Sequence, residues 1–282
     1  MPAEQSEIDN PNDHEFINVS GYRFVNLDNL EALRDKMRAD FAEIGLKGTV
    51  LLAKEGINAA LVGTDNQVTA LQAWFNQDPH FKELWLKQSA SGIIPFSKLK
   101  IRIRPEIITF QPDATQPVSP ADNPAPAMQP TQLKAWLDDK KSFSLLDTRN
   151  AYETDSGTFS DALDLKLNTF RDFAGAVDAA LENGTLDKNE PVVTFCTGGI
   201  RCEKAAPYLI EQGFKEVYQV EGGILNYFEQ CGGEHWDGDC FVFDDRVEIN
   251  PRLEPTGAYM CRECHRAVPA RQICKCEAVS PW

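Results

Sequence analysis

A proline-rich stretch at residues 111–130 divides the 282-residue chain into two parts that we expect to fold separately. It contains six of the 17 prolines and almost no apolar periodicity, a composition typical of an extended linker. Because a single domain usually has ~100–200 residues, we predict one domain at 14–110 and another at 131–232. A C-terminal extension then covers 233–282.

The part before the linker has the element order of a ferredoxin-like (acylphosphatase-like) βαββαβ domain. We predict that Asp28 caps the first helix, whose stripe of Leu30, Leu33, Met37 and Phe41 faces a core. The segment 54–56 predicts a hairpin between two apolar runs. The expected strands are 14–26, 48–54, 57–63, 83–90 and 98–108, and the expected helices are 28–44 and 65–77.

Strands and helices alternate after the linker, which predicts a parallel sheet with helices on both faces. We expect strands at 143–147, 192–195 and 217–220, and helices at 131–139, 170–182, 202–212 and from 224 onward. The chain is therefore α+β in its first domain and α/β in its second. Functional residues of parallel sheets lie just beyond the carboxyl ends of strands, which is where Asp147 and Cys196 fall.

The loop at 196–201 is the strongest candidate site. It consists of Cys196, Thr197, Gly198, Gly199, Ile200 and Arg201, between a strand and a helix. Glycines permit a tight turn whose backbone N–H groups point inward, and the helix N-terminus adds positive partial charge. Such a cradle would stabilise a Cys196 thiolate and lower its pKa below the usual ~8.5.

Two other interpretations of this loop are open. One is a buried cysteine beside a chance Gly-Gly turn, and the other is a protein phosphatase loop. Only four residues separate Cys196 from Arg201, whereas the phosphatase loops have five. The smaller cradle favours thiol or sulfur chemistry over phosphate.

Several strings resemble a rhodanese domain. Leu146-Asp-Thr-Arg-Asn-Ala-Tyr-Glu153 is similar to the rhodanese segment in which an aspartate and an arginine, here Asp147 and Arg149, brace the active-site loop. The turn at 157–162 and the strand-to-helix turn at 219–224 are similar to later rhodanese turns. This resemblance implies a parallel rhodanese sheet.

Longer strings resemble the bacterial oxygen-dependent tRNA uridine hydroxylase family. They are Cys-Thr-Gly-Gly-Ile-Arg-Cys-Glu-Lys-Ala from 196, Trp-Asp-Gly-Asp-Cys-Phe-Val-Phe-Asp-Asp-Arg-Val from 236, and Glu-Gly-Ile-Asn-Ala from 55. The likeness runs from about 14 to 260, whereas a generic rhodanese would match only about 130–230. It implies that Cys196 is essential, that the substrate is tRNA, that molecular oxygen is a co-substrate and that 5-hydroxyuridine is the product.

We hypothesise that Cys196 adds to C6 of the uracil and makes C5 electron-rich enough to react with oxygen. The sequence contains no flavin, haem or nicotinamide motif and no facial triad of iron ligands. Cys202 is either a second working thiol or a packed cysteine. The alternatives to hydroxylation are a thiosulfate sulfurtransferase, with a persulfide on Cys196, and a non-catalytic rhodanese used for binding.

The charge pattern bears on the nucleic-acid partner. Residues 111–282 carry −12 of the net charge of −15, so a polyanion must approach the first domain or a local patch. Lys98, Lys100, Arg102 and Arg104 alternate with apolar residues and would share one face of a strand. They are either an RNA-backbone contact or a solvated sheet face. We expect tRNA, and neither DNA nor a membrane, as partner.

Four cysteines crowd the C-terminus as CxxC followed by CxC: Cys261, Cys264, Cys274 and Cys276. Two such pairs can enclose a tetrahedral zinc, and His265 could replace one thiolate. The other interpretation is a metal-free, disordered tail.

The compartment follows from two further features. The polar, acidic N-terminus differs from a secretory signal, and no apolar run approaches the ~18 residues of a membrane span. We expect a cytoplasmic protein whose clustered cysteines are catalytic or metal-binding rather than disulfide-bonded.

Overall fold

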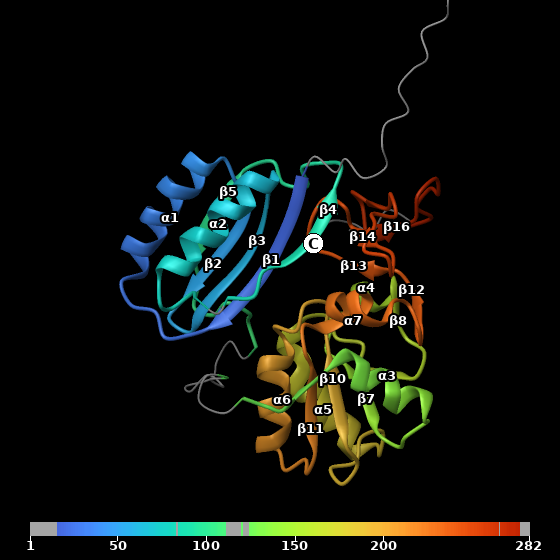
Figure 1. Ribbon diagram of the computed structural model, residues 1–282. Helices are drawn as coiled ribbons and strands as arrows, with labels where there is room; N and C mark the ends of the chain where they lie inside the picture. The colour runs from blue at the N-terminus through green and yellow to red at the C-terminus, as the bar shows by residue number, and fades with distance from the viewer. Residues whose placement is uncertain (1–15, 83, 111–119, 121–123, 265, 277–282) are drawn as a thin grey trace, which may run out of the picture.

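Each half of the chain forms its own five-stranded sheet (Figure 1). The computed structural model describes residues 16–82, 84–110, 120, 124–264 and 266–276. The first domain has its own hydrophobic core. The second domain has one hydrophobic core on each face of its sheet. Among these described residues, no helix has the length and apolar character needed to cross a membrane.

The first domain has the expected ferredoxin-like architecture with one added strand. Its elements are β1 (Phe16–Phe24), α1 (Leu30–Ile44), β2 (Lys47–Ala53), β3 (Gly56–Gly63), α2 (Asp65–Gln77), β4 (Lys87–Ser91) and β5 (Leu99–Ile103). The strand order is β4-β1-β3-β2-β5, and β5 is the added strand, parallel to β2. The predicted hairpin is confirmed, because Ala53 pairs with Gly56 across the turn. Figure 1 shows α1 and α2 on the same face of the sheet.

The predicted start of the first helix is wrong. The helix begins at Leu30, and its N-cap is Asn29 rather than Asp28. Asn29 adopts a left-handed conformation with φ of 50° and its side chain makes no capping bond. Burial of Leu27 and Leu30 in the core directs the chain here, so packing outweighs the capping preference of Asp28.

The second domain is a fully parallel sheet with order β6-β11-β10-β7-β9. Helices α5 and α6 pack on one face, and α3 and α7 pack on the other, as predicted. The strands are β6 (Ala127–Met128), β7 (Ser144–Asp147), β9 (Ala162–Asp164), β10 (Val192–Phe195) and β11 (Val217–Val220). The helices are α3 (Pro130–Asp138), α4 (Ala151–Thr154), η1 (Phe170–Asp172), α5 (Phe173–Glu182), α6 (Cys202–Glu211) and α7 (Gly223–Cys231).

The second domain includes residues that the sequence analysis places in the linker and in the C-terminal extension. Most of the proline-rich segment lies outside the described residues, but Ala127 and Met128 at its end form the edge strand β6. In the C-terminal extension, Trp236 and Cys240 are buried in the second domain's core. The remaining strands are β8 (Gly157–Phe159), β12 (Trp236–Gly238), β13 (Cys240–Phe241), β14 (Glu248–Ile249), β15 (Tyr259–Met260) and β16 (Ala267–Val268), paired as β12-β8, β13-β14 and β15-β16.

Candidate active site

The loop at 196–201 wraps around the sulfur of Cys196. This residue follows β10 directly, and the backbone N–H of Gly199 donates to Cys196 Sγ at 3.1 Å. Gly199 has φ of 98°, a conformation that favours glycine. The turn before α7 closes the loop from behind: a Cβ on Gly223 would lie 2.3 Å from the carbonyl oxygen of Cys196. A larger residue at Gly223 would therefore displace the loop.

The environment of Cys196 favours its thiolate. Burial by itself raises the pKa of Cys196, which is 1% exposed. The hydrogen bond from the Cys202 thiol, the charge of Arg201 and the backbone N–H groups of Arg201 and Gly199 all lower it, and the net pKa is about 6. A nucleophilic thiolate is thus the dominant form at neutral pH, as the loop sequence predicts.

A buried carboxylate positions the arginine of the loop. Glu153 is fully buried and pairs with Arg201 Nη2 at 2.8 Å. Arg201 Nη1 has no hydrogen-bond partner among the described residues. Because guanidinium cannot deprotonate in a protein, Arg201 is a fixed positive charge that lowers the pKa of Cys196.

Asp147 and Arg149 brace the loop at 196–201 indirectly, whereas the resemblance implies that they brace it directly. Their side chains form a fully buried pair, with Arg149 Nη2 and Asp147 Oδ2 2.6 Å apart. Arg149 also donates to the carbonyls of Glu153 and Gly157. The pair therefore fixes the segment that carries Glu153, and Glu153 in turn holds Arg201.

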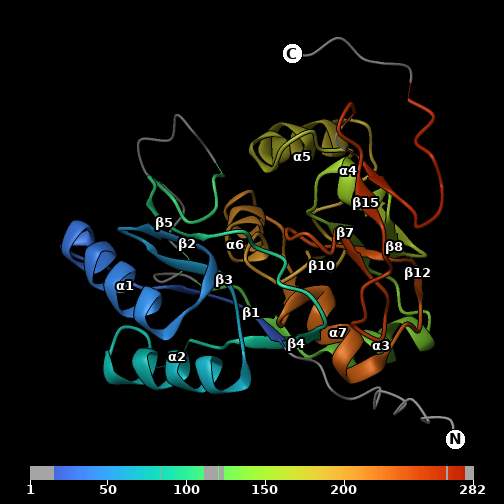
Figure 2. The same ribbon diagram turned by 90° about the horizontal axis from the view of Figure 1, so that it is seen from above.

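The first domain supplies one wall of a cavity beside the loop. This cavity, about 300 Å³ in volume, is lined from the first domain by Tyr22, Trp85 and Lys87 and from the second by Gly199, Glu203 and Gly222, among others. Strand β4, which carries Lys87, lies at the sheet edge facing the second domain, beside α7 (Figure 2). Trp85 is 45% exposed, so the part of its ring that Lys87 does not cover can meet a ligand.

Lys87 brings a cation to the loop. Its Nζ donates to the carbonyl oxygen of Gly198 at 2.6 Å and lies 4.8 Å from the centre of the Trp85 ring. Burial lowers the pKa of Lys87 to about 8, partly opposed by the negative charges of Cys196 and Glu203. At neutral pH the ammonium form therefore predominates, and its proton is easily lost.

Ion pairs and hydrogen bonds fasten the two domains around this cavity. Lys204 of α6 is fully buried and reaches Glu55 at 3.0 Å and Glu106 at 2.6 Å. Tyr22 donates to Glu203 at 3.0 Å. These contacts fix the position of the first domain relative to the helix that follows Cys196.

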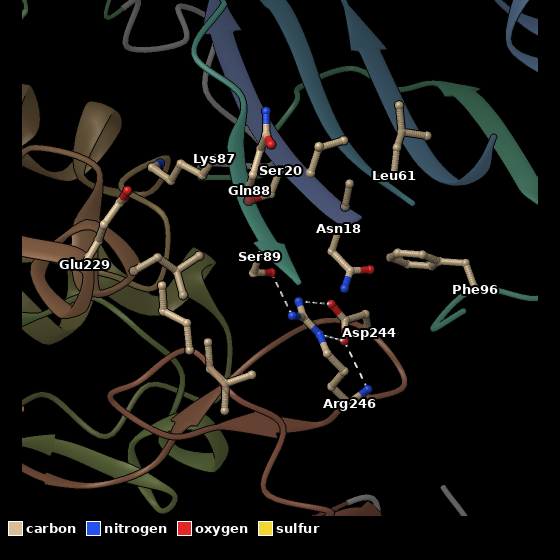
Figure 3. Close-up of a pocket in the computed structure, with 15 residues that line it drawn as sticks. Asn18, Ser20, Leu61, Lys87, Gln88, Ser89, Phe96, Glu229, Asp244 and Arg246 are labelled. Atoms are coloured by element: carbon tan, nitrogen blue, oxygen red, sulfur yellow. Dashed lines mark hydrogen bonds and ion pairs between the residues drawn. The ribbon is translucent and has the colours of Figure 1, made fainter. Parts of the chain in front are cut away.

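A second contact holds β4 on the same face as Lys87 (Figure 3). Arg246 pairs with Asp244 at 2.6 Å and donates to Ser89 Oγ at 2.8 Å, two residues along the strand from Lys87. These side chains and the amide of Asn18 line a small cavity of about 50 Å³. The C-terminal extension therefore fixes the strand that presents Lys87.

The basic residues predicted to contact RNA lie at the opposite edge of the first sheet. Strand β5 is four strands from β4, a separation of roughly 19 Å. Within the predicted stretch β5 contains Lys100 and Arg102, while Lys98 and Arg104 flank it. Lys98, Arg102 and Arg104 are exposed and Lys100 is half-buried.

The four C-terminal cysteines meet, although β16 separates the two pairs in sequence. Their Sγ atoms all lie within 4.8 Å of one another. Cys261 and Cys276 are 3.8 Å apart, and Cys264 and Cys274 are 3.6 Å apart. His265 lies outside the described residues.

The sequence reasoning missed the residues that reach the loop from a distance. Glu153 lies within the string quoted for the rhodanese resemblance, and its place three residues after Asn150 forms a capping box, which indicates a helix start but not the pairing with Arg201. Lys87, Trp85 and Tyr22 carry no local pattern, because the packing of the two domains alone brings them to Cys196.

Comparison with known proteins covers both halves. Residues 16–107 match the UPF0176 acylphosphatase like domain, and residues 129–230 match the rhodanese-like domain. A tRNA uridine(34) hydroxylase of Cupriavidus metallidurans is 44% identical over 90% of each chain. One of Bordetella petrii is 44% identical over 86% of this chain and 96% of its own. A rhodanese-like domain solved from Anabaena is 22% identical, with a TM-score of 0.34 over 40% of this chain and 79% of its own.

Proposed function

The chain belongs to the tRNA uridine(34) hydroxylase family, and from this premise we propose that it hydroxylates uridine 34 of tRNA at C5 with Cys196 as nucleophile. The observation that carries the proposal is the loop at 196–201, where a buried thiolate with a pKa of about 6 lies in a loop whose Gly199 lines an open cavity between the domains. The reaction uses molecular oxygen as co-substrate. Because tRNA is the substrate, the compartment is the cytoplasm.

The base enters the cavity as an unstacked nucleotide of the anticodon loop. Enzymes that modify a base take it out of its stack and hold it against aromatic side chains. Trp85 and Tyr22 provide such surfaces next to Gly199, at the mouth of the loop. The uracil ring stacks on Trp85, and its edge meets the polar groups around Lys87.

Addition of the Cys196 thiolate to C6 moves electrons toward C5 and the C4 carbonyl. The resulting enolate needs a positive partner in a site with little water. Lys87 supplies that charge, since its Nζ lies beside the loop at Gly198. Arg201 stays paired with Glu153 and holds the thiolate before the attack. The electron-rich C5 then reacts with oxygen.

We expect 5-hydroxyuridine to form when purified protein, a thiol reductant and unmodified tRNA are incubated in air, and to be absent under argon. Cys196→Ala should abolish the product, because it removes the nucleophile. Nucleoside mass spectrometry of digested tRNA measures this. Cys231→Ser, which changes a thiol of α7 outside the loop, is the matched control.

Product formed by Cys196→Ala at the wild-type rate would overturn the proposal. So would the absence of 5-hydroxyuridine from wild-type reactions in air, combined with a persulfide on Cys196 after thiosulfate treatment. That second result would make the protein a sulfurtransferase.

Trp85→Ala should raise the KM for tRNA by about tenfold or more with a smaller change in kcat. Stacking of a base on an aromatic side chain contributes roughly 1–3 kcal/mol, and Trp85 is the exposed ring of the cavity. Trp85→Phe keeps a stacking surface and should recover most of the affinity. An unchanged KM in the alanine variant would remove Trp85 from the base site.

The basic residues of β5 are proposed as contacts to the tRNA backbone. Lys98, Arg102 and Arg104 are exposed, and the strand leads into Glu106, which pairs with Lys204 of the second domain. A tRNA whose anticodon loop enters the cavity extends far enough to cross a sheet roughly 19 Å wide. These contacts would add affinity without selecting a base.

The C-terminal cysteines are proposed to bind one structural zinc ion. Tetrahedral Zn–S bonds of ~2.3 Å place sulfur atoms ~3.8 Å apart, close to the 3.8 Å and 3.6 Å between the sulfurs of the two cysteine pairs. Four close thiols without a cation would repel one another once ionised. We expect one zinc per chain by elemental analysis of the purified protein, and a reduced zinc content in Cys264→Ser.

A further inference from the structure

Cys202 lies directly behind the nucleophile. It is the first residue of α6, it is fully buried, and its thiol is a main cause of the lowered pKa of Cys196. Its Sγ is 3.8 Å from Oγ1 of Thr148, whose hydroxyl donates to the carbonyl oxygen of Phe195 at 2.9 Å. The interaction between the two thiols lowers the pKa of Cys196 and raises that of Cys202, so Cys202 is the protonated partner.

The protonation states of the two thiols are complementary. Burial and the neighbouring Cys196 raise the pKa of Cys202 well above its ordinary value, whereas the pKa of Cys196 is about 6. The pair is thus one thiolate and one thiol at neutral pH. This is the arrangement of a dithiol in which one sulfur attacks and the other resolves the product.

Hydroxylation by molecular oxygen needs two electrons beyond those of the substrate. Complete reduction of dioxygen to one hydroxyl group and one water takes four electrons, and oxidation of the C5–H bond provides two. A pair of thiols that becomes a disulfide provides the other two.

We propose that Cys196 and Cys202 form a redox pair that supplies these two electrons and becomes a disulfide in each turnover. This inference rests on the proposed hydroxylation and adds the source of its electrons. A cellular thiol or dithiol, abundant in a reducing compartment, returns the disulfide to the dithiol.

Four steps lead from the Cys196 adduct to 5-hydroxyuridine and the disulfide. The enolate of the Cys196 adduct adds dioxygen at C5 and takes up a proton, which gives a C5 hydroperoxide. Loss of the C5 proton and of the Cys196 thiolate restores the ring double bond. That thiolate then attacks the distal peroxide oxygen, so the O–O bond breaks, 5-hydroxyuridine forms and Cys196 becomes a sulfenic acid. Cys202 attacks this sulfur, its proton leaves with the hydroxyl as water, and the disulfide closes.

Geometry favours Cys202 over the other buried thiol near the loop. Cys240 interacts with Thr197 of the loop and with the charges of Arg149 and Glu153, whereas Cys202 interacts with Cys196 itself. The backbone N–H of Cys202 donates to the carbonyl oxygen of Gly199 at 3.0 Å, and the N–H of Gly199 donates to Cys196 Sγ at 3.1 Å, so one short turn holds both cysteines. Its burial also shields the pair from external oxidants between turnovers.

The experiment is a single-turnover reaction of reduced wild-type protein with unmodified tRNA in aerated buffer, without added thiol. We expect one equivalent of 5-hydroxyuridine per chain and a Cys196–Cys202 disulfide, identified by peptide mass spectrometry. Incubation in air without tRNA should leave both thiols free. Added dithiothreitol should restore multiple turnovers.

Two variants separate a redox role from a packing role. Cys202→Ser should still give one equivalent of product but leave Cys196 as a sulfenic acid that reacts with dimedone, and its steady-state rate with dithiothreitol should fall about tenfold because resolution becomes intermolecular. Cys202→Ala should behave in the same way. Cys231→Ser should form the Cys196–Cys202 disulfide as the wild type does.

Continued turnover of wild type without any thiol, or product formation that leaves both thiols free, would overturn the redox pair while leaving the hydroxylase intact. Failure of the proposed function itself gives a different result, namely no 5-hydroxyuridine even with dithiothreitol and air. A Cys202→Ser protein that forms product without any dimedone adduct would also refute the pair.

Discussion

Replacing Lys87 with methionine should lower the rate of uridine hydroxylation by about 100-fold or more, the effect expected for loss of a positioned acid or charge. Methionine retains the length and apolar stem of the side chain but loses the contacts of the ammonium group with the Trp85 and Tyr22 rings. The lost element is the ammonium group beside the loop at Gly198. Steady-state kinetics with nucleoside mass spectrometry should show the loss in kcat, with the KM for tRNA changed only a few-fold.

The pH dependence distinguishes this role from a structural one. Wild-type kcat/KM should rise with pH as Cys196 deprotonates near pKa 6 and fall as Lys87 deprotonates near pKa 8, which gives a bell-shaped profile. Lys87→Met should lose the alkaline limb and keep the acidic one. Lys87→Arg should move the alkaline limb upward, because guanidinium stays protonated.

Lys82→Met is the matched control, because Lys82 is exposed and lies five residues before Lys87. It should leave the rate and the profile unchanged. A Lys87→Met protein that retains both limbs of the profile would assign the alkaline limb to another group and remove Lys87 from the chemistry.

The parts of the site that depend on local sequence could be predicted, and those that depend on packing between domains could not. Two glycines and Arg201 between a strand and a helix determine the shape of the loop at 196–201, so the low pKa of Cys196 follows from residues within the loop and the first residue of α6. Lys87 comes from the short strand Lys-Gln-Ser-Ala-Ser, which has no apolar alternation. Only contacts such as Arg246 with Ser89 place it at the cavity.

In the fold, too, features that depend on local sequence could be predicted and features that depend on packing could not. The strand and helix periods of the second domain predict its parallel sheet, because both faces are covered and its strands are continuously apolar. The start of α1 could not be predicted, because the capping preference of Asp28 is weaker than burial of Leu27 and Leu30. Part of the linker became β6 because β11 offers it an unpaired edge.

Glu153→Gln should destabilise the protein by about 3–5 kcal/mol, the range measured when one partner of a buried ion pair is removed. Glu153 is fully buried, and its carboxylate is the ion-pair partner of Arg201. Glutamine keeps the size of the side chain, so the loss comes from the charge rather than from a cavity. Urea denaturation monitored by circular dichroism should show a lower midpoint with an unchanged slope.

A double-mutant cycle tests whether that loss comes from the unpaired charge on Arg201. Arg201→Met removes the stranded cation, so the Glu153→Gln/Arg201→Met protein should be more stable than Glu153→Gln alone, because no uncompensated buried charge remains. Its Cys196 should have a higher pKa, since the charge of Arg201 lowers it in the wild type. The pH dependence of iodoacetamide labelling at Cys196 measures this shift. Equal stability of the double and single variants would mean that Glu153 acts through its hydrogen bond to Asn150 rather than through Arg201.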